Sequence, residues 1–97
     1  MKLREALDRV DQLTDDDVIF ARKPWTLDSE AEIGRLDSNY RVPAVSTRRG
    51  LKYFLEASVI NEVLEVFGDR EPSAEQCRLL LMYYAENDAF PSWVYES

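Results

Sequence analysis

The side chains that most often carry catalysis are scarce in this chain of 97 residues. Histidine is absent, and Cys77 is the single cysteine. A serine or cysteine nucleophile needs a general base beside it, so this composition excludes Ser-His-Asp and Cys-His catalysis. One cysteine without histidine also cannot build the usual zinc sites. Because Cys77 stands next to the apolar run Leu79–Leu81, we expect it to be a small buried residue.

Carboxylates and arginines are the remaining groups that could act on a ligand. The run Asp15–Asp17 lacks the spaced ligands and the turn glycine of a calcium loop, so we interpret it as a solvated helix stop. Arg41, Arg48 and Arg49 could bind phosphate, but the chain has no glycine-rich phosphate loop. We expect these arginines to pair with acids of the second half instead. The prediction is a protein that is not an enzyme, with no catalytic residue, no cofactor and no metal.

The last fifteen residues, YYAENDAFPSWVYES, hold the strongest functional signal. They contain five of the eleven aromatic residues (two Trp, five Tyr and four Phe). Aromatic rings with polar handles are enriched in protein interfaces, and acids beside them favour a basic partner. The same rings could instead pack the last helix and the tail onto the sheet. The candidate partner-binding residues are Tyr83, Tyr84, Glu86, Asp88, Phe90, Trp93 and Tyr95.

The acidic charge is concentrated in the second half of the chain. Residues 1–50 carry nine Lys/Arg and ten Asp/Glu, a net charge of −1, whereas residues 51–97 carry three and nine, a net charge of −6. Such a field repels nucleic acid and anionic membranes and attracts a basic protein. No apolar run has the length of a membrane span, and the N-terminal segment lacks the apolar core of a signal peptide. Together with the single cysteine, this predicts a cytoplasmic protein.

Hydrophobic spacing in the first half predicts one helix and two strands. Apolar residues of segment 3–13 recur at helical spacing, which favours a helix. The run at 18–21 is β-branched and aromatic, which favours a strand. A second strand is expected at 31–36, where Gly34 marks a bulge or a close approach. Segment 37–50 shows no period and is expected to be a loop.

The second half reads as one strand and two helices. Segment 51–57 alternates, which predicts a strand with Leu51, Tyr53, Leu55 and Ala57 on one face. The stripe that follows, 59–67, predicts a helix, and a single helix over 51–67 is the alternative. Ser73 and Gln76 have the spacing of a capping box and open the last helix. Residues 92–97 are expected to form an extended tail or a short edge strand.

These elements predict an α+β fold in one domain, residues 1–97. The expected order is an N-terminal helix, a small three-stranded sheet and two C-terminal helices packed on one face. A chain of this length can bury a core without disulfides. Trp25, which follows Pro24 after the first strand, is either a lid on that core or an exposed interface anchor.

Two segments carry a resemblance to known proteins. LKYFLEA (51–57) and YYAENDAFP (83–91) resemble a pattern found in small uncharacterised bacterial domains, over roughly residues 50–92. That resemblance implies no activity and no site residues. In size, acidic balance and lack of catalytic residues, the chain is also similar to immunity proteins of bacterial toxin systems. Those proteins are typically cytosolic, acidic and encoded beside a toxin.

The function we expect from the sequence is protein binding. An immunity or antitoxin-like inhibitor that occludes a basic protein is its concrete form, with acids attracting the partner and aromatic rings sealing the contact. The alternative is a structural or adaptor domain that self-associates through the last helix, which would give a homodimer. An enzyme that uses carboxylates is a third reading, but no base, nucleophile or cofactor site can be assembled from the motifs.

Overall fold

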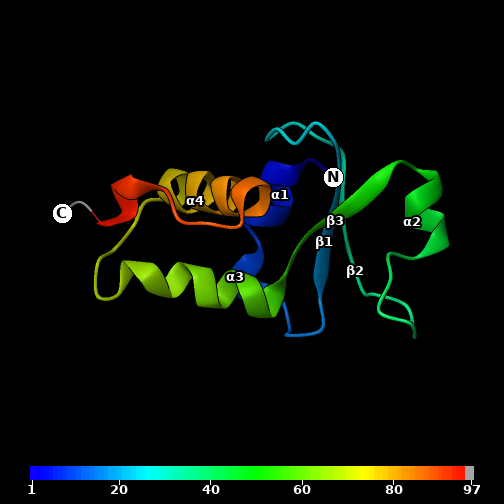
Figure 1. The fold of residues 1–97 in the computed structure, drawn as a ribbon, viewed down its shortest axis with the longest axis horizontal. Helices are drawn as coiled ribbons and strands as arrows, with labels where there is room; N and C mark the ends of the chain where they lie inside the picture. Colours follow the sequence, from blue (N-terminus) through cyan, green and yellow to red (C-terminus); the bar gives the residue numbers. More distant parts are fainter. Residues whose placement is uncertain (96–97) are drawn as a thin grey trace.

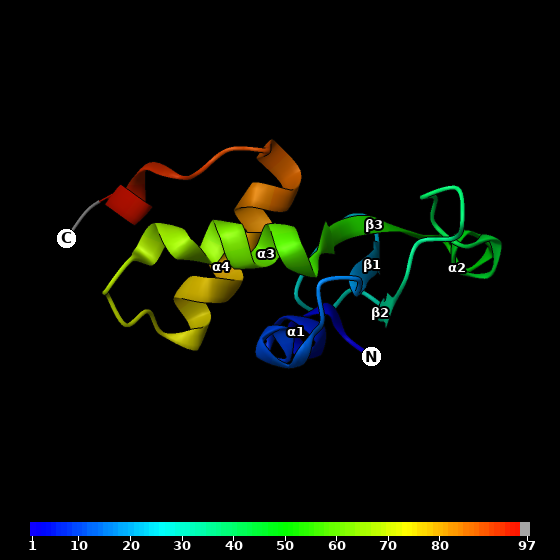
Figure 2. The same cartoon turned by 90° about the horizontal axis from the view of Figure 1, so that it is seen from below.

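The computed structural model describes residues 1–95 (Figure 1). Three strands form an antiparallel sheet in the order β2–β1–β3. Helices α1, α3 and α4 lie on one side of this sheet and α2 lies on the other, as Figures 1 and 2 both show. The elements are α1 (Leu3–Leu7), η1 (Val10–Gln12), β1 (Val18–Arg22), β2 (Ala31–Gly34), α2 (Ala44–Arg48), β3 (Leu51–Glu56), α3 (Ala57–Leu64), η2 (Glu65–Phe67), α4 (Ala74–Asn87) and η3 (Ser92–Tyr95), where η is a 3-10 helix. The predicted α+β class, with two C-terminal helices on one face of a three-stranded sheet, is confirmed.

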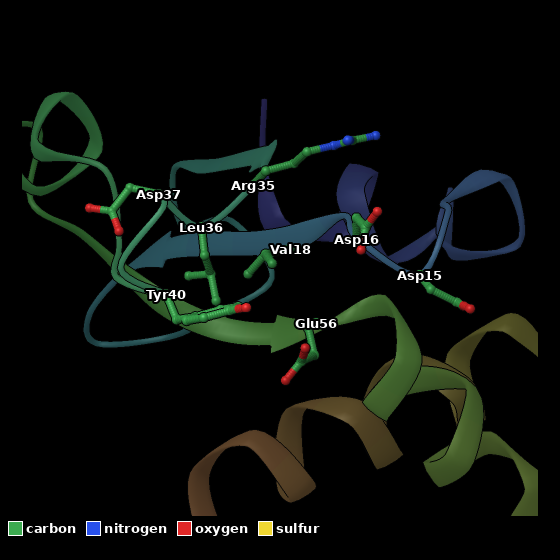
Figure 3. Close-up of a pocket in the computed structure, with 8 residues that line it drawn as sticks. All are labelled: Asp15, Asp16, Val18, Arg35, Leu36, Asp37, Tyr40 and Glu56. Atoms are coloured by element: carbon green, nitrogen blue, oxygen red, sulfur yellow. The ribbon is translucent and has the colours of Figure 1, made fainter.

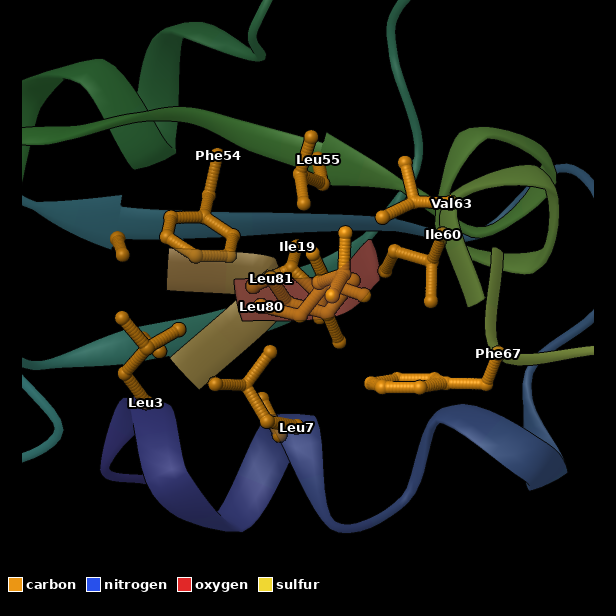
Figure 4. Packing of buried hydrophobic residues seen from close by; sticks show 14 residues of the cluster. Leu3, Leu7, Ile19, Phe54, Leu55, Ile60, Val63, Phe67, Leu80 and Leu81 are labelled. Carbon is orange, nitrogen blue, oxygen red and sulfur yellow. The ribbon is translucent and has the colours of Figure 1, made fainter. Parts of the chain in front are cut away.

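The main hydrophobic core lies between the sheet and the three helices α1, α3 and α4 (Figure 4). Each element contributes side chains that are removed from water almost completely. Examples are Leu3 of α1, Ile19 of β1, Leu55 of β3, Ile60 of α3 and Leu80 of α4. Burial of such side chains is the main favourable term in folding, about 1.5–3 kcal/mol for each one.

A second and smaller cluster lies on the opposite face of the sheet. It consists of Val18, Phe20 and Leu51, covered by Leu36 and Val42 from the segment between β2 and β3. The sheet is therefore covered thickly by helices on one face and thinly by one segment on the other. This arrangement explains why β1 reads as a continuous apolar run, since residues of both its faces are buried.

A β-bulge in β3 breaks the alternation expected from the sequence. Ile19 pairs with Leu55 and Phe20 pairs with Tyr53, so Phe54 is an extra residue without a partner on β1. The bulge brings Phe54 and Leu55, although consecutive, into the same core cluster. Leu51 joins the small cluster on the other face, and Tyr53 is partly exposed. The prediction that Leu51, Tyr53 and Leu55 share one face is therefore wrong.

The first helix is shorter than predicted. Leu3, Ala6 and Leu7 are buried as the apolar stripe requires, but α1 ends at Leu7 and the chain continues through the 3-10 turn η1. Asp8, which follows the last helical residue, accepts two hydrogen bonds from the Arg78 guanidinium of α4, at 2.8 and 3.0 Å. These bonds lower the pKa of Asp8 and fix the end of α1 against α4.

The segment expected to be a loop contains the short helix α2. Five residues are too few to show a helical period, and tertiary contacts hold this helix in place. The buried hydroxyl of Ser46 donates to Glu32 on β2 at 2.8 Å, and Arg49 pairs with Glu30 and Glu32. Gly34 provides the close approach that the sequence suggested, because a Cβ there would lie 3.2 Å from the Phe20 ring.

The strand-then-helix reading of residues 51–67 is confirmed, since β3 runs into α3 with no loop between them. At the start of α4, Ser73 and Gln76 form the predicted capping box. The prediction of an extended tail or edge strand over 92–97 is wrong for 92–95, which form η3, while the last two residues lie outside the described part of the chain. Val94 is fully buried, and its packing draws this segment onto the core.

Candidate protein-binding site

A groove runs between the edge strand β3 and the C-terminal part of α4. It has a volume of about 300 Å³. A second hollow of about 300 Å³ shares Trp25 with it. We call the two hollows together the Trp25 groove. Its lining residues are Lys23, Pro24, Trp25, Tyr53, Phe54, Leu55, Val59, Tyr84, Ala85, Glu86 and Asp88.

The indole of Trp25 is held firmly in this groove. Its Nε1 donates a hydrogen bond to the carbonyl oxygen of Ala21 at 3.2 Å. The ring packs edge-on against Phe54, with 5.0 Å between centroids and 76° between planes. The ammonium of Lys23 lies 4.6 Å from the indole centroid. A fixed aromatic ring loses little conformational entropy when a partner covers it, so Trp25 is suited to be an anchor.

The end of α4 supplies the other wall of the groove. Tyr84 is half-buried and packs on Phe90, with 5.4 Å between ring centroids. Asp88 ends the helix in the left-handed conformation (φ 51°), and its N–H donates to the carbonyl oxygen of Tyr84 at 2.8 Å. Glu86 and Asp88 are both exposed. The groove therefore combines aromatic walls with carboxylates that water reaches.

Tyr53 links the groove to a further acid. Its hydroxyl donates to Glu56 Oε1 at 3.0 Å. Burial, followed by this hydrogen bond and the charge of Glu56, raises the pKa of Tyr53 to about 12. Tyr53 stays neutral in the folded protein at pH values where it ionises in the unfolded chain.

The raised pKa of Tyr53 predicts a loss of stability at high pH. The folded protein holds a proton that the unfolded chain releases above about pH 10, so the contribution is complete below pH 10 and is lost as pH rises towards 12. Two full units would give ~2.7 kcal/mol, but the ring is 36% exposed, so we expect about 1 kcal/mol. Urea unfolding of wild type and Tyr53→Phe at pH 9, 10 and 11 measures it. If the free energy of unfolding falls equally with pH in the two proteins, the raised pKa of Tyr53 does not contribute to stability.

The structure brings only part of the predicted set together. Tyr84, Glu86 and Asp88 line the Trp25 groove. Trp93 instead packs on Phe67, at 6.3 Å between centroids, and lines a separate hollow. Three other members lie outside the groove lining. Tyr83 (41% exposed) is on α4, Phe90 packs under Tyr84, and Tyr95 (69% exposed) is on η3.

The groove also contains residues that the cluster at the end of the chain did not include. Trp25 packs on Phe54 as a lid on the core would, and it also lines the groove, while its role as an interface anchor stays a prediction. The alternation of residues 51–57 predicts that Tyr53 shares a face of the strand with Leu51 and Leu55. The bulge at Phe54 changes that phase, and no local pattern signals it.

An acidic pocket of about 240 Å³ lies on the other face of the sheet (Figure 3). Its carboxylates do not converge, since Asp15 and Asp37 stand at opposite ends of the pocket in Figure 3. Within the described residues, no three acidic or sulfur side chains are arranged to hold a metal ion. Asp17 accepts hydrogen bonds from the backbone N–H and the hydroxyl of Thr14, as a turn after a helix does. The pocket is lined by Asp15, Asp16, Val18, Arg35, Leu36, Asp37, Tyr40 and Glu56.

The arginines of segment 37–50 do not pair as predicted. Arg49 forms ion pairs with Glu30 and Glu32, which belong to the first half of the chain rather than the second. The reason is the sheet, which places β2 beside the segment that carries Arg49. Arg41 and Arg48 are exposed and make no ion pair with any described residue.

Cys77 is half-buried and packs against the main core. Burial raises the pKa of its thiol. A nucleophilic cysteine needs the opposite shift, because the thiolate is the reactive form. Cys77 thus has the environment of a packing residue.

None of the helices within residues 1–95 is long and apolar enough to cross a membrane. No curated protein and no solved structure matches the chain. One family model does match, over residues 1–93, and its description is a domain of unknown function, DUF7716. The matched residues include every residue that lines the Trp25 groove. This agrees with the resemblance to a small uncharacterised domain family, whereas no match concerns immunity proteins. The chain therefore belongs to the DUF7716 family.

Proposed function

We propose that this protein is a binding domain that docks a basic, partly aromatic segment of another protein in the Trp25 groove. The observation that carries the proposal is the combination at one place of a fixed indole, a half-buried Tyr84 and the exposed acids Glu86 and Asp88. Interface hot spots are aromatic residues of this kind, and exposed acids beside them attract a cationic partner.

The size of the groove supports a protein ligand rather than a cofactor. Each hollow measures about 300 Å³, the lower end of the range for small-molecule pockets. Such a space takes one or two side chains of a partner, while the surrounding surface takes the rest. The net charge of −6 on residues 51–97 adds a field that draws a basic partner towards β3 and α4.

The concrete form that we propose is a stoichiometric inhibitor of the immunity or antitoxin type, acting in the cytoplasm. Binding would cover the functional surface of a basic partner, and no chemistry is required of this chain. Support comes from the acidic charge, the absence of histidine and the exposed aromatic rings.

Peptides selected on the purified protein test the proposal. From a library of random 12-residue peptides, we expect the bound fraction to be enriched in Lys, Arg and aromatic residues. Reversing both rim acids, Glu86→Lys with Asp88→Lys, is expected to lower the association rate of a selected peptide about tenfold. Dissociation should change less. Stopped-flow tryptophan fluorescence follows both rates.

A matched control separates position from net charge. Glu62 of α3 and Glu65 of η2 are exposed and line none of the hollows of the groove. Glu62→Lys with Glu65→Lys changes the net charge from −7 to −3, as the rim variant does. We expect it to keep most of the association rate. Two results would contradict the proposed site. One is an equal decrease of the association rate in both variants, and the other is an association rate of the wild type that does not fall as the salt concentration rises.

A further inference from the structure

The charge of this molecule is distributed unevenly along the chain. Residues 35–50, which join β2 to β3, contain four arginines and one aspartate, a net charge of +3. Arg35 and Arg49 pair with acids outside this segment, so Arg41 and Arg48 are the arginines it offers to a partner. The rest of the chain contains eight basic and eighteen acidic residues, a net charge of −10. We call residues 35–50 the α2 lobe. It lies at one end of a body 43 Å long, across the sheet from α3 and α4 (Figures 1 and 2).

The α2 lobe exposes apolar side chains together with its positive charge. Tyr40 is 85% exposed, more than any other large hydrophobic residue in the described part, and Val45 is 65% exposed. A tight turn presents Tyr40: Asp37 Oδ1 accepts from the N–H groups of Asn39 and Arg41, at 2.8 and 3.0 Å. Tyrosine and arginine are the residue types that anchor protein interfaces.

We infer that the α2 lobe of one copy docks in the Trp25 groove of a second copy. The lobe offers aromatic and cationic side chains, Tyr40, Arg41 and Arg48. The groove offers aromatic rings and carboxylates. The two surfaces are therefore opposite in charge, and both carry aromatic side chains that can pack against each other. The inference rests on the proposed function, because it uses the same groove, and it adds that a basic partner must displace a second copy.

Net charge does not prevent this contact. Two copies of charge −7 repel at long range, but physiological salt screens charges beyond about 8 Å. That distance is short compared with the 43 Å length of the molecule. The charges close to the contact therefore determine whether two copies attract or repel each other. The contact joins unlike surfaces, which makes it a head-to-tail association rather than a symmetric one.

Sedimentation equilibrium of two complementary variants tests the inference. The lobe variant carries Arg41→Glu and Arg48→Glu, and the groove variant carries Glu86→Lys and Asp88→Lys. Wild type is expected to gain mass with concentration. Each variant alone should lose at least about thirtyfold in association constant. Their equimolar mixture should associate again, because one variant keeps its groove and the other keeps its lobe.

A chain that carries all four substitutions is the sharpest control. Its net charge is again −7, because the two reversals to glutamate offset the two reversals to lysine, and the charges of the two surfaces are exchanged. We expect it to self-associate again, and we expect the Glu62→Lys, Glu65→Lys variant to behave as wild type. A wild type that stays monomeric at about millimolar concentration, well above the micromolar range of weak specific contacts, would overturn the inference, as would a mixture that does not associate.

The lobe variant distinguishes the test of peptide binding from the test of self-association. If it binds the selected basic peptide as wild type does but no longer self-associates, both proposals are supported. If the mixture of variants associates while no peptide binds, the self-association stands without the proposed function. If peptides bind the groove and no variant or wild type associates, the proposed function stands and the head-to-tail contact is wrong.

Discussion

Replacing Trp25 with alanine is expected to weaken the binding of a groove-selected basic peptide about thirtyfold, or ~2 kcal/mol. The indole is fixed by its hydrogen bond to Ala21 and by Phe54, and it lines both hollows of the groove. Removing it takes away the largest apolar surface offered there to a partner. Isothermal titration calorimetry with the peptide measures the change in affinity.

Trp93→Ala is the matched control for this substitution. Trp93 is also a half-buried indole packed on a core phenylalanine, Phe67, but it lines a different hollow. We expect the two variants to lose comparable stability and only Trp25→Ala to lose peptide affinity. The reverse outcome would move the binding site to the hollow lined by Phe67, Arg70 and Trp93.

The largest effect on stability is expected at Phe54. Phe54→Ala should lower the free energy of unfolding by about 3–5 kcal/mol, because the ring is 1% exposed and its loss leaves a cavity beneath Trp25. That is a large share of the free energy of unfolding of an ordinary domain, which is about 5–15 kcal/mol. Urea unfolding measures it, and Phe54→Leu provides a milder variant if the alanine variant does not fold.

Tyr53→Ala tests whether the effect belongs to the bulge. Tyr53 precedes Phe54 in β3 and is partly exposed, so we expect its loss to cost about 1 kcal/mol. In a regular strand with the predicted alternation, Tyr53 would face the core and Phe54 would not, and the order of the two effects would be reversed. Equal losses for the two variants would argue against the bulge.

The parts of the fold that the sequence predicted depend on local signals. The run at 18–21 is apolar and β-branched, and it forms β1. Ser73 and Gln76 lie three residues apart, and they cap α4 as the spacing requires. A change of hydrophobic period distinguishes the strand β3 from the helix α3 that follows it. In each case neighbouring residues alone decide the structure.

Other parts depend on contacts between distant segments, which periodicity does not describe. The bulge at Phe54 is set by pairing with β1, more than thirty positions earlier in the chain. The helix α2 is held by Glu32 of β2, and the end of α1 is held by Arg78 of α4. Periodicity indicates which residues share a face of a helix or strand, but it does not indicate where the helix ends or where a bulge interrupts the strand.

The residues of the candidate site also fall into two groups, those that are close in the sequence and those that meet only in the folded chain. Tyr84, Glu86 and Asp88 were found because they lie close together in the sequence. Trp25 and Tyr53 reach the groove from β1 and β3, so their proximity to Tyr84 exists only in the folded chain. Conversely, Trp93 and Tyr95 belong to the same stretch of sequence but turn away with η3.

The bulge at Phe54 also has a consequence for comparing members of the family. One extra residue changes the phase of β3, so that Leu51 and Leu55 serve opposite faces of the sheet although they are four positions apart. A relative with a one-residue deletion near position 54 would have a regular strand, in which the residues aligned with Leu51 and Leu55 are three positions apart and still face opposite sides of the sheet. Alignment gaps at this position therefore carry structural meaning, and they should be placed by face of the sheet rather than by residue similarity.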